Sequence, residues 1–274
     1  MSVASERHDL LRLTWREASD WVERDPVILI PIGSTECEGP HLPLGSDFLV
    51  SLRVAQVVAR RTDSLVAPGV PCGISPGFVG FPGTISLHPN SLAAVTRDIV
   101  ESLIRQGFRR FLAVANHGPN MPVVEAVARE LMENHCETIV AAVWPAELTG
   151  QVATAMGIPS AGRGHGGDPA TSIMLAVSPG DVRMDLAEAD NPPVIGALKL
   201  KSSSTAEISG VPVRWFSKVH AWSRSGVTGD PLTSSAERGR VIFDKVCDMI
   251  ADVVLYLKSM ELGQGTSLLE AGQS

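Results

Sequence analysis

Continuous apolar runs alternate with amphipathic stretches along the first half of the chain. Four runs rich in β-branched residues are typical of strands buried on both faces: 27–32 (VILIPI), 65–70, 111–115 (FLAVA) and 138–144 (TIVAAVW). Apolar residues recur every three or four positions in three stretches, which predicts helices over 48–60, 91–106 and 121–133. This alternation indicates βαβ units and a parallel sheet with helices on both faces.

The helix boundaries and the second half of the chain are predicted from capping and turn residues. Asp47 and Asn90 are the expected N-caps of the first two helices. A short helix is predicted over 168–177 and a long amphipathic helix over 235–260, whereas 145–164 and 191–232 look irregular. We therefore expect a single α/β domain over 1–260, followed by a small, polar and disordered tail over 261–274.

Composition narrows the class of protein. Of the 274 residues 44% are hydrophobic, which excludes a disordered chain, and 30 acidic against 23 basic residues give a net charge of −7. The sequence shows no basic stripe, so we expect no nucleic-acid partner. It has no apolar run of about 18–20 residues and no apolar signal core, so we expect no membrane segment and a cytoplasmic protein. The four cysteines form no CxxC pair and are expected to be reduced.

The polar segment after the first strand, GSTECEGPHLPLGSD at 33–47, is the first candidate for chemistry. Glu36 and Glu38 are two residues apart, so in extended chain their carboxylates share one face. Like charges held this close repel unless a cation or a shared proton lies between them, and a divalent metal resolves the conflict. The alternative is a solvated acidic turn in which Asp47 only caps the following helix.

Two further polar clusters contain a histidine. His117 leaves a predicted buried strand within ANHGPN, where it is placed to bind a metal or move a proton, or simply to satisfy a turn. His165 lies among four glycines, which allow the backbone to approach a ligand closely. Asp168, with Pro169 after it, has a purely structural alternative as a helix cap. No P-loop signature is present, and the letters GISPG at 73–77 and GRGHGG at 162–167 match GxSxG and GxGxxG without lying directly between a predicted strand and a helix, as those motifs require.

Four motifs in order resemble those of the creatininase (creatinine amidohydrolase) family: GSTECEGPHLPLGSD (33–47), GFPGTISL (80–87), ANHGPN (115–120) and HGGDPATS (165–172). GVTGDP at 226–231 is also similar to the family pattern. The resemblance implies a three-layer α/β/α sandwich with a mostly parallel central sheet. It also implies a hexamer with two divalent ions per chain, commonly Zn or Mn, and hydrolysis of C–N bonds in small molecules.

The resemblance assigns roles to four residues that match the family motifs. Glu36 matches the first glutamate ligand, and Asp47 matches the aspartate that bridges both metals. His117 matches the histidine that completes the first metal site, and His165 matches a histidine used as an acid/base or substrate contact.

Three other positions depart from the family pattern. Glu38 replaces a histidine ligand and Ala170 replaces a glutamate ligand, both of the second metal site. Pro119 stands where creatininase itself has a glutamate. Asp168 does not compensate, because residues two apart at a helix start do not face the same way. We therefore expect one divalent ion, Zn or Mn, held by Glu36, Asp47 and His117, with open positions for water.

The predicted function is that of a metal-dependent amidohydrolase that attacks an amide or cyclic amide of a small molecule with activated water. Glu38 is the expected general base, and His165 the expected proton donor to the leaving nitrogen. Cys37 is expected to be structural, because neighbouring negative charge raises the pKa of a thiol. Two alternatives stay open: a biosynthetic enzyme that performs ring closure, condensation or elimination, and an inactive homologue that binds a ligand or partner.

Overall fold

A parallel four-stranded sheet forms the centre of the computed structural model, which describes residues 7–159 and 162–262. Its strand order is β2-β1-β3-β4, and every neighbouring pair is parallel. The strands are β1 (Val27–Ile32), β2 (Leu65–Val66), β3 (Arg110–Ala115) and β4 (Ile139–Val143). The predicted parallel sheet is confirmed. Strand β2 is shorter than the expected 65–70, although Ala67 N and Val70 N still donate to Leu29 O and Pro31 O of β1, each at 2.9 Å.

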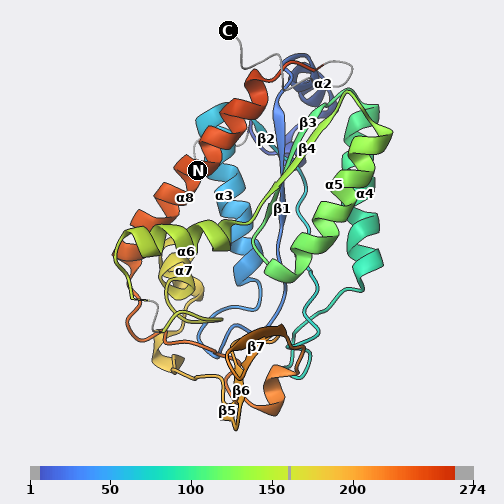
Figure 1. Ribbon diagram of the computed structural model, residues 1–274. Helices are drawn as coiled ribbons and strands as arrows, with labels where there is room; N and C mark the ends of the chain where they lie inside the picture. The colour runs from blue at the N-terminus through green and yellow to red at the C-terminus, as the bar shows by residue number, and fades with distance from the viewer. Residues whose placement is uncertain (1–6, 160–161, 263–274) are drawn as a thin grey trace.

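Helices cover both faces of this sheet, as Figure 1 shows. One face carries α3 (Ser46–Thr62), α6 (Pro145–Ala155), α7 (Ala170–Val177) and α8 (Ala236–Ser259), whose apolar residues form one core cluster. The other carries α2 (Trp15–Glu23), α4 (Pro89–Arg105) and α5 (Met121–Asn134), which contribute to a second cluster. The three-layer α/β/α sandwich is therefore confirmed.

The alternation of side chains along β1 separates the two cores. Val27 and Leu29 belong to the cluster under α3 and α8, whereas Ile28, Ile30 and Ile32 belong to the cluster under α4 and α5. All five side chains are buried, because successive residues of a strand point to opposite faces and both faces are covered. The continuous apolar run in the sequence therefore has a direct structural cause.

Two predicted N-caps are wrong. Helix α3 begins at Ser46, so Asp47 lies in its first turn, and its carboxylate is bonded to other loops. Helix α4 begins at Pro89, and the ring of His88 accepts a hydrogen bond from Asn90 N at 3.3 Å. The predicted cap at the start of α7 is also wrong, since Pro169 precedes its first residue and Asp168 is engaged elsewhere.

A second, antiparallel sheet lies within the stretch that was expected to be irregular. It runs in the order β5 (Val194–Ile195), β6 (Leu198–Leu200), β7 (Thr205–Ile208) and β8 (Val211–Arg214). These strands have two to four residues each, too few for a periodic pattern to be recognised in the sequence. Helix α6 likewise occupies 145–155, where no helix was predicted. Figure 1 shows the small sheet at the end of the molecule where β1 finishes.

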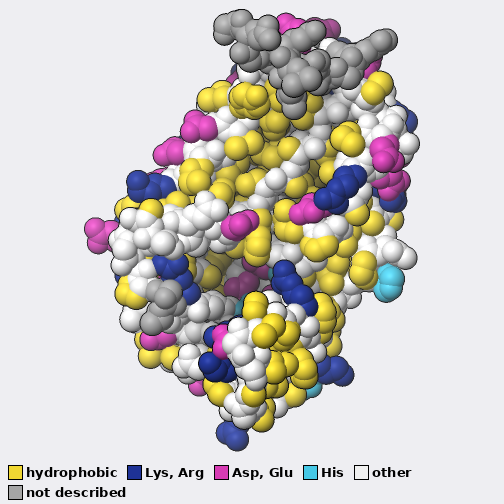
Figure 2. Space-filling model, viewed as in Figure 1, with side chains coloured by type: hydrophobic (Ala, Val, Ile, Leu, Met, Phe, Trp, Pro, Cys, Tyr) yellow, Lys and Arg dark blue, Asp and Glu magenta, His cyan; other side chains and the backbone are white. Residues whose placement is uncertain are grey.

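Strand β4 forms one edge of the parallel sheet and is only half-buried along its length. Figure 2 shows hydrophobic side chains gathered over this region, between α8 and α5. Among the described residues, no helix has the length and apolar content needed to cross a membrane. The single domain over 1–260 stays a prediction, and the predicted tail lies, from residue 263 on, outside the described residues.

We expect the contact between α7 and α8 to be intolerant of added volume. A Cβ atom at Gly239 would lie 1.8 Å from the carbonyl oxygen of Ser172, so Gly239→Ala should lower the free energy of unfolding by about 1–3 kcal/mol. Gly150 of α6 is the matched control, because nothing lies within 4 Å of its added Cβ. Gly150→Ala should stabilise the protein by about 0.5–1 kcal/mol. Urea denaturation of both variants measures this, and equal effects would contradict the account.

Candidate metal centre

The register of the parallel sheet brings the first two motifs together. Ile32 and Ala115, the last residues of β1 and β3, are paired partners, so the chain leaves both strands at the same edge. The loop after β1 carries Glu36, and the loop after β3 carries His117. Helix α3 starts beside this edge and presents Asp47 from its first turn. Ligand sites in parallel α/β sheets form at this carboxyl edge.

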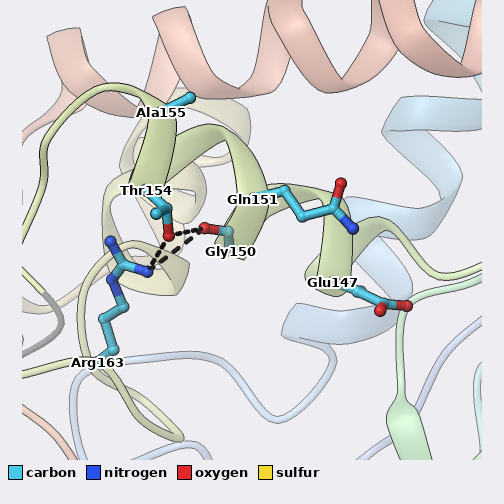
Figure 3. A pocket seen from close by; sticks show the side chains of 6 residues that line it. All are labelled: Glu147, Gly150, Gln151, Thr154, Ala155 and Arg163. Atoms are coloured by element: carbon cyan, nitrogen blue, oxygen red, sulfur yellow. Dashed lines mark hydrogen bonds between the residues drawn. The ribbon is translucent and has the colours of Figure 1, made fainter.

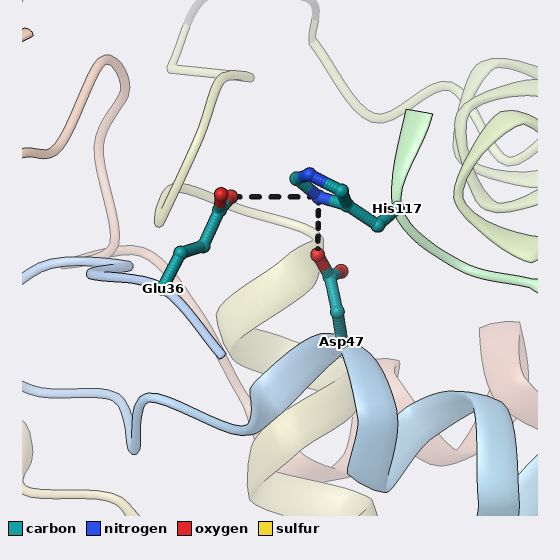
Figure 4. A group of neighbouring side chains, drawn as sticks. All are labelled: Glu36, Asp47 and His117. Carbon is teal, nitrogen blue, oxygen red and sulfur yellow. Dashed lines mark hydrogen bonds and ion pairs between the residues drawn. The ribbon is translucent and has the colours of Figure 1, made fainter. Parts of the chain in front are cut away.

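The three predicted metal ligands, Glu36, Asp47 and His117, point toward one another, as Figure 4 shows. His117 Nδ1 lies 2.8 Å from Asp47 Oδ2 and 3.5 Å from Glu36 Oε1. One donor atom from each of the three residues lies within 4.8 Å of the other two. Two carboxylates and one imidazole form a donor set suited to Zn or Mn.

The burial of Glu36 supports a cation at this place. Its side chain is 2% exposed, and Oε2 has no hydrogen-bond partner among the described residues. Burial and the charge of Asp47 raise the pKa of Glu36, although His117, His165 and the nearby hydroxyl of Ser75 oppose the shift. A buried carboxylate oxygen without a donor is costly, and a divalent ion would supply the missing positive charge. The residues present therefore fit a metal ion.

His117 is oriented by the Gly/Pro-rich loop over 71–83. Its Nε2 lies 2.9 Å from the carbonyl oxygen of Ile74, to which it donates, so Nδ1 faces the carboxylates. Burial alone would lower the pKa of His117, but the charges of Glu36 and Asp47 outweigh it and raise the pKa to about 9. Holding one ring nitrogen in this way directs the other toward a metal.

Residues beside the predicted ligands hold Asp47 in place. Ser34 Oγ donates to Asp47 Oδ2 at 2.9 Å, and Asn116 Nδ2 donates to Oδ1 at 3.0 Å. Asn120 links the loops further, since Nδ2 donates to Gly33 O at 2.9 Å and Oδ1 accepts from Ile74 N at 3.0 Å. We did not single out these residues from the sequence. Their position directly after β1 and β3 is the signal that points to them.

His165 reaches the centre from the third motif. Its Nδ1 lies 3.7 Å from Glu36 Oε1, and its Nε2 lies 2.6 Å from the carbonyl oxygen of Cys37. The ring stacks on Phe78 with a centroid distance of 4.2 Å. Thr228 of the GVTGDP segment holds the backbone of His165 by two hydrogen bonds of 2.9 Å. Thr228 N donates to His165 O, and His165 N donates to Thr228 Oγ1. These contacts fix the ring beside the three predicted ligands.

Glu38 is buried next to the same carboxylates. Burial raises its pKa well above the ordinary value, and the negative charges of Asp47 and Glu36 raise it further. Among the described residues, no side chain or backbone N–H donates a hydrogen bond to its carboxyl group. Cys37, between the two glutamates, is also buried, which raises the pKa of its thiol. This agrees with a structural role for the cysteine.

The remaining family positions offer little to a second metal. Ala170 begins α7 and Pro119 lies in a 3-10 turn, and neither side chain has a donor atom. Asp168 is already engaged: it forms a 2.9 Å ion pair with Arg238 and accepts hydrogen bonds from Ser172 and Ser234. The expectation that Asp168 does not replace the lost ligand agrees with these contacts.

A shallow hollow beside α6 contains none of the predicted site residues. Its lining is shown in Figure 3 and comprises Glu147, Gly150, Gln151, Thr154, Ala155 and Arg163. The guanidinium of Arg163 is committed to the protein itself, since Nη1 donates to Thr154 Oγ1 at 2.8 Å and Nη2 donates to Ile158 O. Arg163 therefore ties its loop to α6.

Comparison with known proteins relates the whole sandwich to one family. The family model for creatinine amidohydrolase, Creatininase, matches residues 11–254. The mycofactocin precursor peptide peptidase of Mycolicibacterium smegmatis is 32% identical over 234 residues, which cover 83% of each chain. The creatinine amidohydrolase of Pseudomonas putida is 33% identical and covers 88% of this chain and 94% of its own.

Solved structures show the same relationship. A crystal structure of creatinine amidohydrolase (creatininase) superposes with a TM-score of 0.75 at 26% identity and covers 90% of this chain and 96% of that one. Similar structures include a Zn-Zn type mutant creatininase and a Mn creatininase, with TM-scores of 0.74 and 0.73, each at 25% identity. They cover 90% of this chain and 96% and 97% of theirs.

We expect substitution of Asp168 to lower the stability of the fold and substitution of His117 to lower the amount of bound metal. Asp168→Asn breaks the ion pair with Arg238 and should lower the free energy of unfolding by about 1–3 kcal/mol without loss of metal. His117→Ala should lose most of the bound metal, because it removes one of three donors. Denaturation and metal analysis of both variants test this. Loss of metal in Asp168→Asn, with its fold intact, would show that Asp168 is a ligand.

Proposed function

The chain belongs to the creatininase family of amidohydrolases, and we propose that it hydrolyses an amide C–N bond with a single divalent ion held by Glu36, Asp47 and His117. The buried Glu36 oxygen without a partner is the observation that carries this proposal. Zn and Mn forms among the similar structures support these metals as occupants. Ala170, in place of a ligand, supports one ion rather than two.

An ion in this position would supply electrophilic activation of the substrate carbonyl and of a water molecule. Glu38 and His165 would carry out the proton transfers. Glu38, buried beside Glu36 and Asp47, accepts a proton from the attacking water through its carboxylate oxygen. Its charge is not needed for metal binding in this arrangement, which frees the carboxylate for this role.

His165 delivers a proton to the leaving nitrogen. Because Nε2 donates to Cys37 O, Nδ1 is the ring atom that faces the centre and the atom from which a proton can pass to the leaving nitrogen. Stacking on Phe78 limits rotation of the ring. Its side chain is 20% exposed, so a substrate can approach it while the three predicted ligands stay more deeply buried. Water first attacks the amide carbonyl carbon, the tetrahedral adduct then collapses with cleavage of the C–N bond, and the amine departs.

The substrate class is an amide or cyclic amide of a small molecule or short peptide. The relatives named above act, by their names, on creatinine and on a precursor peptide, and both reactions concern C–N bonds. A structure titled as a creatininase mutant complexed with creatine shows a small molecule bound on this fold. A hexamer and a cytoplasmic location stay predictions from the resemblance and the sequence.

A non-hydrolytic reaction is the second candidate, and Ala170 favours it. Loss of a ligand for the second metal weakens water activation but leaves an electrophilic ion for the carbonyl. In that case an amine of a second substrate or of the same molecule replaces water, and the product is a new amide or ring.

We expect Glu38→Gln and His165→Gln to lower kcat about 10²–10⁴-fold while the bound metal is retained, because each removes a proton-transfer group. The assay measures amine release from creatinine, cyclic amides and short peptides with added Mn²⁺ or Zn²⁺. Glu147→Gln is the matched control, since this exposed α6 residue touches none of the site residues and should keep full activity.

Full activity of both Glu38→Gln and His165→Gln would contradict these roles. No amine release from any amide, together with turnover when an amine nucleophile is added, would instead select the non-hydrolytic candidate. No turnover of any kind with metal bound would favour an inactive homologue.

A further inference from the structure

Helices α3 and α8 place basic side chains opposite each other, away from the metal ligands. Arg53, Arg60 and Arg61 of α3 line one hollow together with Val57; Arg60 lies seven positions after Arg53, about two helical turns, and Arg61 follows it directly. Arg240 faces them from the first turns of α8. Four guanidinium groups therefore gather in a protein whose net charge is −7.

These side chains surround a hollow of about 500 Å³, a volume in the range of small-ligand sites. Helix α7 contributes Ala176 and Val177 to the wall, and α8 contributes Phe243, which is 9% exposed. The hollow thus combines an apolar floor with a basic rim. We call it the arginine groove, and its complete lining is Arg53, Val57, Arg60, Arg61, Ala176, Val177, Arg240, Phe243 and Asp244.

Only part of the positive charge in the arginine groove is balanced. Arg61 forms ion pairs with Asp244 at 3.2 Å and with Asp248 at 2.7 Å, which tie α3 to α8. Arg53, Arg60 and Arg240 have no hydrogen bond or ion pair with any described residue.

The unbalanced charges repel one another. Burial lowers the pKa of Arg60, and the neighbouring charges of Arg53 and Arg61 lower it further. Like charges held together without counter-charge create a positive potential that attracts anions. An anion in the groove would remove this repulsion.

We propose that the arginine groove binds a small anion that carries two or more phosphate groups, as in a nucleoside diphosphate or triphosphate. Arginine presents paired N–H donors that match phosphate oxygens, and Arg53 and Arg60, about 10 Å apart along α3, spread these donors over a greater length than one phosphate group covers. The apolar floor of Val57 and Phe243 offers contact area to an organic portion of the ligand.

The site is separate from the proposed catalytic machinery. No residue of the arginine groove contributes to the metal centre, to the Glu38 position or to the His165 contacts. Helix α3 nevertheless carries both Asp47, in its first turn, and Arg53 and Arg60 further along. Substitutions of the arginines therefore report on anion binding without removing a catalytic group.

The test is isothermal titration of the metal-loaded protein with ATP, ADP, AMP, adenosine and inorganic pyrophosphate at about 50 mM NaCl. We expect saturable binding of ATP, ADP or pyrophosphate, with AMP weaker by about fivefold or more and adenosine without binding. The triple variant R53Q/R60Q/R240Q should weaken this binding by about tenfold or more. Tighter binding of ATP than of pyrophosphate would assign a role to the apolar floor, whereas equal binding would place the recognition in the phosphates alone.

The matched control is Arg16→Gln, because Arg16 is also exposed and forms no ion pair with the residues that the structure describes, but it lies on α2 and stacks over Trp15. It should bind ATP like the unaltered protein. Any phosphate contact with the metal ion occurs equally in all variants, so the difference reports on the groove. Three outcomes would overturn the proposal: no saturable binding of ATP, ADP or pyrophosphate, equal affinity of the triple variant, or equal binding of AMP and ATP.

Discussion

The negative charge buried at the carboxyl edge of the parallel sheet is the constraint on which the site depends. Glu36 and Asp47 face one imidazole, and the protein supplies Glu36 with fewer donors than its two oxygens require. A buried carboxylate persists only where a cation, a donor or a proton compensates it. Glu38 adds a third buried acidic group to the same place, and its carboxyl group receives no hydrogen bond from the described residues. A divalent cation held by Glu36, Asp47 and His117 would compensate the two ligand carboxylates.

The rest of the sandwich holds these groups at fixed distances. The register between β1 and β3 places their following loops side by side, and the apolar layers on both faces bury these two strands. Hydrogen bonds from Ser34 and Asn116 set the carboxylate of Asp47, and the carbonyl of Ile74 sets the ring of His117. Because the supporting groups come from different loops, the geometry depends on the fold as a whole.

The buried strands and the edge of the sheet that carries the site can be predicted from the sequence. The apolar runs of β1 and β3 identify buried parallel strands, and polar residues directly after such strands identify the edge where Glu36 and His117 meet. The cap role predicted for Asp47 is wrong, whereas its place beside Glu36 and His117 agrees with the ligand role that the resemblance implies; an aspartate near a helix start looks the same in either case. The role of Ile74 escaped prediction, since a backbone carbonyl carries no side-chain signal. The strands β5–β8 escaped as well, because strands of two to four residues leave no periodic pattern.

The most direct measurement of the central claim is the divalent metal content per chain, by inductively coupled plasma mass spectrometry, after purification without chelator and loading with Mn²⁺ or Zn²⁺. We expect about one ion per chain, with Glu36, Asp47 and His117 as donors. The variant E38H/A170E, which restores the family donors, serves as the reference for a second ion. Two ions in the unaltered protein would contradict the single-metal site, and the absence of any bound ion after loading would contradict the metal centre itself.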